Sequence, residues 1–123
     1  MPSNPIAWFE IYVQDTNRAK TFYEAVLDTS LNRMNSGDLE MCGFPHSTTS
    51  YGASGALVRM SGMPSGGNST IVYFASQDCA IEAARVAPAG GKVMKPKFSI
   101  GEHGFIALAY DTEGNIFGLY SMK

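Results

Sequence analysis

The segment Ala7–Leu27, AWFEIYVQDTNRAKTFYEAVL, predicts a β-strand that runs directly into an α-helix. The strand is expected over Ile6–Val13, which is apolar and β-prone apart from the charge of Glu10. Asp15 can cap the helix, because a short carboxylate accepts hydrogen bonds from the free N–H groups of a first helical turn. The helix is expected over Thr16–Leu27, and apolar residues at helical spacing form one face of it: Ala19, Phe22, Tyr23 and Val26.

The same unit recurs in the second half of the chain, in Thr70–Ala87, TIVYFASQDCAIEAARVA. Here a strand over Thr70–Ala75 leads to Asp78 as the cap of a helix that ends by Ala87, before Pro88. A Gly- and Ser-rich linker, Ser61–Ser69, separates the halves. The remaining strands are expected at Ser30–Met34, Leu39–Phe44, Gly55–Met60, Lys92–Phe98, Phe105–Tyr110 and Ile116–Met122.

Each half therefore follows the order β-α-β-β-β. The predicted fold class is α+β, with two βαβββ modules whose curved mixed sheets surround a cavity. Residues 1–123 are expected to form one domain, with module 1 at about 5–62 and module 2 at about 68–123.

Composition narrows the classes of partner. The formal net charge of −2 gives no electrostatic reason to expect nucleic acid or an anionic membrane as a partner. No apolar run approaches the roughly 20 residues of a membrane span. Two cysteines, Cys42 and Cys79, do not make a disulfide framework, so a reduced, cytoplasmic setting is expected. Cys79 fits the buried face of the second helix, so it is expected to be packed and inert.

Three motifs resemble the vicinal oxygen chelate superfamily, which contains glyoxalases, bleomycin-resistance proteins and extradiol dioxygenases. The motifs are V-x-D-x-x-x-A-x-x-F-Y from Val13 to Tyr23, A-G-G-K-V from Ala89 to Val93, and D-x-x-G-N-x-x-x-L from Asp111 to Leu119. With the order of elements, this resemblance covers essentially the whole chain. It implies the paired βαβββ fold but no particular activity, because this fold hosts isomerases, lyases, dioxygenases and drug-sequestering proteins.

The resemblance also implies where metal ligands would stand. The metal enzymes of the family place His, Gln or Glu on the first and last strand of each module. The corresponding positions here are assigned to Trp8, Val72, Gly118 and either Leu57 or Val58. None of these side chains offers a lone pair suited to a divalent ion. We therefore expect no metal site of the usual kind and no cofactor.

Glu10 is the best candidate for a catalytic group. Strand side chains alternate, so Trp8, Glu10 and Tyr12 share one face, and the resemblance implies that this face looks into the cavity. A partly desolvated carboxylate there could act as a general base. Alternatively, Glu10 only shapes the pocket, and His46, His103 and Glu102 are solvent-facing loop residues rather than a non-standard metal site.

The leading functional hypothesis is a glyoxalase/bleomycin-resistance-like homodimer that binds a small molecule without a metal. The residues expected to line the ligand pocket are Trp8, Glu10, Val72, Phe74, Gly118 and Tyr120. One alternative is a lyase, isomerase or dioxygenase-related enzyme that uses Glu10 as a base, with or without a non-standard metal site recruited from His46, His103 or Glu102. The other is a purely structural dimer whose own side chains fill the cavity.

Overall fold

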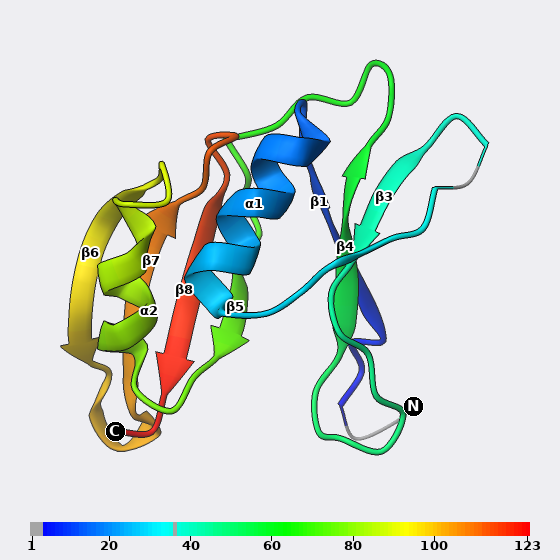
Figure 1. The fold of residues 1–123 in the computed structure, drawn as a ribbon. Coiled ribbons are helices and arrows are strands. Elements are labelled where there is room, and N and C mark those ends of the chain that lie inside the picture. The colour runs from blue at the N-terminus through cyan, green and yellow to red at the C-terminus, as the bar shows by residue number, and fades with distance from the viewer. Residues whose placement is uncertain (1–3, 36) are drawn as a thin grey trace.

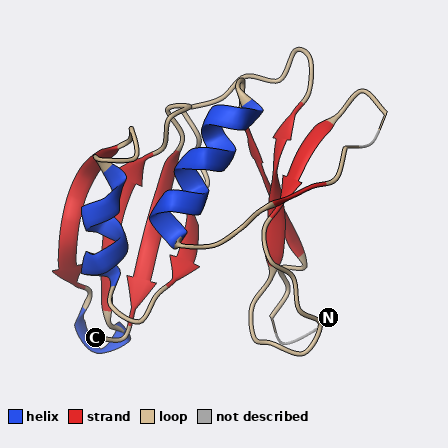
Figure 2. Cartoon of the chain, in the orientation of Figure 1, coloured by secondary structure: helices blue, strands red, loops and turns tan. Residues whose placement is uncertain are grey.

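The computed structural model describes residues 4–35 and 37–123. Within these residues the chain forms two helices and two four-stranded sheets (Figures 1 and 2). The first half contributes β1 (Trp8–Tyr12), α1 (Thr16–Leu27), β2 (Asn32–Arg33), β3 (Glu40–Gly43) and β4 (Ser54–Arg59). The second half contributes β5 (Val72–Ala75), α2 (Cys79–Val86), β6 (Lys92–Ser99), the 3₁₀ turn η1 (Gly101–His103), β7 (Phe105–Tyr110) and β8 (Ile116–Ser121).

The two sheets repeat one topology, with strand orders β1-β4-β3-β2 and β5-β8-β7-β6. In each, the first strand runs parallel to the last strand of its half, and the other pairs are antiparallel. This arrangement confirms the predicted α+β fold with two βαβββ modules. We call the sheets the first sheet (β1–β4) and the second sheet (β5–β8).

Both helices begin at the predicted aspartates. The Asp15 side chain accepts from the backbone N–H of Arg18 at 3.0 Å, and that of Asp78 accepts from the N–H of Ala80 at 3.1 Å. The predicted face of α1 is buried, with Ala19, Phe22, Tyr23 and Val26 at most 1% exposed. Helix α1 packs against β3, β4 and α2, whereas α2 packs against β6, β7 and β8. In Figure 1, α1 therefore lies between the two sheets.

Several strands are shorter than the sequence pattern predicts. The first strand begins at Trp8 rather than Ile6, and β2 is reduced to Asn32–Arg33. Strand β6 lies at the edge of the second sheet, and its pairing register shifts between Lys95 and Phe98. Pro96 lies in that interval and has no N–H to donate to a ladder, which explains the irregularity.

An aromatic cluster joins the two halves. Its rings come from both sheets and from α1: Phe9, Phe22, Tyr23, Phe44, Phe74 and Phe117. Tyr23 is in contact with rings of both halves, with centroids 5.7 Å from Phe44, 5.8 Å from Phe74 and 5.4 Å from Phe117. These spacings are typical of edge and tilted aromatic packing. The hydrophobic core is therefore continuous across the two modules.

Neither α1 nor α2 has the length and apolar character needed to cross a lipid bilayer, over the part of the chain that the structure describes.

Candidate functional site

A polar and aromatic cluster lies on the face of β1 that points away from α1. Glu10 accepts from the Tyr12 hydroxyl at 2.8 Å and from the Trp8 indole N–H at 3.3 Å. This confirms that the three side chains share a face. The hydrogen bond to Glu10 is the main cause that raises the pKa of Tyr12, so this hydroxyl stays protonated and keeps donating to the carboxylate.

A cavity of about 290 Å³ lies along β1. It is formed by residues 9–12 of β1, by the segment that leads into β5, and by the start of β5 and of β8. We call it the seam cavity, because β1 and β5 are the strands at which the first and second sheets end. Its wall is mainly apolar, with Phe9, Ile11, Val72 and Ile116, and Glu10 and Tyr12 also line it.

Asn115 and Ser65 position one side of this cavity. The Asn115 amide and the Ser65 hydroxyl both donate to the backbone carbonyl of Tyr12, at 3.0 and 2.6 Å. The Asn115 side chain also accepts from the N–H of Gly66 at 2.6 Å. Asn68 lies in the segment that leads into β5 and links it to β8. Its side chain accepts from the backbone N–H of Ile116 and donates to the backbone carbonyl of the same residue.

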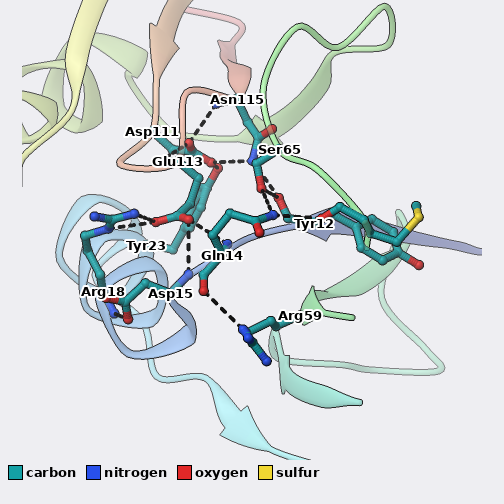
Figure 3. Close-up of polar contacts among 11 residues, drawn as sticks. Tyr12, Gln14, Asp15, Arg18, Tyr23, Arg59, Ser65, Asp111, Glu113 and Asn115 are labelled. Carbon is teal, nitrogen blue, oxygen red and sulfur yellow. Dashed lines mark hydrogen bonds and ion pairs between the residues drawn. The ribbon is translucent and has the colours of Figure 1, made fainter. Parts of the chain in front are cut away.

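Glu113 is a buried latch between the two modules (Figure 3). Its side chain is 0% exposed, and its carboxylate accepts from the backbone N–H groups of Gln14 and Asp15 at 2.7 and 3.2 Å. Arg18 adds an ion pair of 2.6 Å between Nη2 and Oε2. The β7–β8 turn of the second module is therefore fixed to the start of α1 in the first, where a negative charge is favoured by the helix dipole.

Asp111 makes a second buried connection between the modules. Its carboxylate accepts from the Tyr23 hydroxyl at 2.6 Å, from the N–H groups of Glu113 and Asn115, and from the Asn115 side chain. Burial is the largest cause that raises the pKa of Tyr23 well above its ordinary value, and the charge of Asp111 adds to it. The D-x-x-G-N turn therefore stabilises the seam at which the cavity lies.

Comparison with known proteins places the chain in a family. The model of the Glyoxalase/Bleomycin resistance protein/Dioxygenase superfamily matches residues 5–119. The chain belongs to this superfamily. A comparison with curated protein sequences finds no match.

Solved structures of the superfamily share the fold. A glyoxalase/bleomycin resistance protein from Albidiferax ferrireducens is 21% identical, with a TM-score of 0.73 over 96% of this chain and 99% of that one. The antibiotic-binding protein TnmS3 from a Streptomyces species is 23% identical, with a TM-score of 0.69 over 100% of this chain and 99% of that one. Glyoxalase I from Zea mays is 20% identical, with a TM-score of 0.74 over 95% of this chain but only 46% of its own. The chain spans about half of the maize enzyme.

The side chains at the positions assigned to metal ligands do not fit a divalent cation. The Trp8 indole N–H is a donor and is already bonded to Glu10. Gly118 has no side chain, and Leu57 and Val58 are aliphatic and at most 1% exposed. Among residues 4–35 and 37–123, no three His, Cys, Asp or Glu side chains gather where they could hold a metal ion. The positions assigned to metal ligands therefore offer no donor set for a divalent cation.

The position assigned to Val72 requires a correction. Val72 pairs with Phe117 and Phe74 pairs with Leu119, and both partners are buried on the helix side of the second sheet. Val72 stands six residues before its cap Asp78, whereas Trp8 stands seven before Asp15, and a difference of one residue reverses the face of a strand. Val72 still lines the seam cavity, but it is not the counterpart of Trp8.

The remaining predicted pocket residues do not converge on one site. Phe74 belongs to the aromatic cluster and lines a second cavity of about 230 Å³ that also involves Phe9 and Phe44. Gly118 and Tyr120 lie on the opposite face of the second sheet. A Cβ atom at Gly118 would stand 2.2 Å from the Tyr73 ring, so Tyr73 occupies the space predicted to be open there.

The histidines lie apart from one another. His46 is near Trp8, with ring centroids 6.4 Å apart, whereas His103 is in η1 at the end of the second sheet and pairs with Glu102 at 3.9 Å. Both residues of that pair are largely exposed, as expected for loop residues. Cys42 and Cys79 are buried, and burial raises the pKa of the Cys42 thiol, which keeps it protonated.

Sequence reasoning missed Tyr12, Asn68 and Asn115 as residues that shape the seam cavity. It treated residues 61–69 as a linker and the turn at 111–115 as a simple turn. Asparagine in a Gly-rich segment often bonds nearby backbone, and this signal was available at Asn68. The pairing of Asn115 with Tyr12, 103 residues away, has no local signal.

Proposed function

We propose that this protein is a metal-independent small-molecule-binding member of its superfamily, with the seam cavity as its ligand site. The observation that supports this most directly is a mainly apolar cavity of about 290 Å³ with Glu10 and Tyr12 on its wall. Ligand sites of proteins are typically apolar concavities with a few polar groups that set orientation.

The surroundings of the cavity support the same proposal. Trp8 is 40% exposed and lies on the same face of β1 as Glu10, so its ring is available to stack on an apolar or aromatic ligand. The structural similarity to an antibiotic-binding protein is consistent with this role. The residues Trp8, Gly118, Leu57 and Val58, which the resemblance assigns to ligand positions, support binding without a metal, because none of their side chains can coordinate one.

A homodimer in the cytoplasm is part of the proposal. Tyr73 is 45% exposed on the face of the second sheet that carries Gly118, and Ile106, Leu108 and Tyr120 are only half-buried there. A second copy of the chain would cover such a surface, and the pockets would then lie at or near the interface.

Trp8→Ala tests the ligand site. A set of small aromatic compounds is screened against ¹⁵N-labelled protein, and backbone amides of residues 9–12 and 66–72 are expected to shift on binding. The dissociation constant of a bound compound is expected to rise about tenfold in Trp8→Ala, because an aromatic contact surface is lost.

Tyr51→Ala is the matched control, since it removes an aromatic ring that is 92% exposed and that lies in the loop before β4, not on the face of β1 that carries Trp8 and Glu10. Compounds whose binding shifts only amides far from residues 9–12, or whose affinity is unchanged in Trp8→Ala, would contradict the proposed site.

A further inference from the structure

Glu10 is held by two aromatic hydrogen-bond donors, Trp8 and Tyr12. In the described part of the chain, ion pairs with Lys or Arg are made by Glu24, Glu40, Asp78 and Glu113. Glu10 makes none there, and the side chains that donate to it, Trp8 and Tyr12, are both neutral. Two neutral donors orient a carboxylate without cancelling its charge.

The rings of both donors stand beside Glu10, and the His46 ring lies next to Trp8 with centroids 6.4 Å apart. Trp8 stands two residues before Glu10 and Tyr12 two residues after it, on the same face of β1. The indole N–H and the phenol hydroxyl each donate to the carboxylate. The faces of such rings carry negative potential and attract cations. A positively charged group placed at Glu10 would therefore meet a carboxylate and two aromatic rings together.

The seam cavity supplies the remaining part of the recognition. Phe9, Ile11, Val72 and Ile116 give it apolar lining, with Phe9 and Ile11 pointing to the opposite face of β1 from Glu10 and Tyr12, which also line it. An apolar body can enter this space while a charged group stays at its margin, where Trp8 is still 40% exposed to water. The arrangement selects for charge at one end of a ligand and for hydrophobicity at the other.

From this geometry we infer that the ligand is an organic cation: an ammonium group bound at Glu10 between Trp8 and Tyr12, with an apolar or aromatic body in the seam cavity. This inference rests on the proposed function and adds the chemical class of the ligand. A neutral or anionic molecule of the same shape loses the attraction of the carboxylate and the cation–π contribution of the rings.

Three probes of matched shape test the inference: 4-tert-butylbenzylammonium, 4-tert-butylbenzyl alcohol and 4-tert-butylbenzoate. Trp8 is the single tryptophan of the chain, so its fluorescence, excited at 295 nm, reports directly on the site. The ammonium is expected to bind about tenfold more tightly than the alcohol, and the benzoate most weakly.

The variant Glu10→Gln keeps the shape of the side chain and removes its charge. It is expected to abolish the preference for the ammonium while the dissociation constant of the alcohol stays within about twofold. Glu102→Gln is the matched control, because it removes the same charge from a side chain that is 90% exposed in η1. It is expected to leave the preference intact.

The possible outcomes separate the inference from the proposed function. Equal affinities for the ammonium and the alcohol, or a preference that survives in Glu10→Gln, overturn the inference and leave the proposed binding site standing. Failure of all three probes to bind at millimolar concentration overturns both. If Glu10→Gln instead weakens self-association and leaves the ratio of probe affinities unchanged, a second copy of the chain neutralises Glu10, and the inference is wrong.

Discussion

Tyr23→Phe removes one hydroxyl from the buried connection between the two modules. The ring of Tyr23 is 0% exposed and is packed among Phe22, Phe44, Phe74 and Phe117, and these contacts remain in the variant. The variant loses the 2.6 Å hydrogen bond to Asp111. The Oδ2 atom of Asp111 then keeps only the longer hydrogen bond of 3.2 Å from the Asn115 side chain. Removing a donor to a buried carboxylate costs about 2 kcal/mol of unfolding free energy.

Equilibrium unfolding in urea measures this loss. With an m value of about 2 kcal/mol/M for a chain of this size, the midpoint is expected to fall by about 1 M. Tyr51→Phe makes the same chemical change at a side chain that is 92% exposed, and its unfolding free energy is expected to change by less than about 0.5 kcal/mol.

The pH dependence provides an independent check. The folded-state pKa of Tyr23 is raised, so the stabilisation is fully present below the unfolded-state pKa of about 10 and is lost as the pH rises from there toward the folded-state value. The difference in stability between the wild type and Tyr23→Phe is therefore expected to shrink between about pH 10 and 11. The reasoning is refuted if Tyr23→Phe loses no more stability than Tyr51→Phe. It is also refuted if the difference in stability between the wild type and Tyr23→Phe is constant over this pH range.

Three further predictions follow from other contacts. Glu113→Gln is expected to lower the unfolding free energy by about 1–3 kcal/mol in urea titrations, because the new NH₂ group cannot accept from Arg18 or from backbone N–H; an unchanged midpoint would show that the latch is dispensable. Lys97→Met is expected to flatten the acid limb of the stability curve: the Lys97 hydrogen bond, followed by that of the Ala80 N–H, lowers the pKa of Asp78, so this stabilisation is present above about pH 4 and is lost as the pH falls through the folded-state pKa. Urea midpoints between pH 2.5 and 6 check the slope, and equal slopes would contradict it. Elemental analysis of protein purified without chelators or a metal-affinity tag is expected to find no stoichiometric divalent metal, and EDTA is expected to leave the melting temperature unchanged; a bound metal that is lost in Glu10→Gln would overturn the metal-independent proposal.

The elements that could be predicted from the sequence are those with local signals. Asp15 and Asp78 are helix caps because a short carboxylate satisfies free N–H groups, and this chemistry needs no distant partner. The helical spacing of Phe22 and Tyr23 likewise predicted the buried face of α1, because this periodicity is local to the helix. Strand ends were less well predicted, since β2 contains only residues 32–33.

The candidate site depended on information that the sequence does not carry locally. A shift of one residue in register moves a side chain to the other face of a strand. This is why Val72 and Phe74 were grouped with Gly118, although both lie on one side of the second sheet and Gly118 lies on the other. Tyr73 was overlooked because its position above Gly118 depends on pairing between β5 and β8. By contrast, Trp8, Glu10 and Tyr12 were correctly grouped, because they stand two residues apart on one strand.

The aromatic cluster has a consequence for the history of a repeated chain. Phe9, Tyr23 and Phe44 come from the first half and Phe74 and Phe117 from the second, and each set is covered by the other. A half-length polypeptide would expose its share of these rings to water and lose the apolar burial that stabilises the fold. An ancestral gene that encoded one βαβββ unit would thus have needed its product to assemble in pairs, and duplication followed by fusion would have made that association permanent.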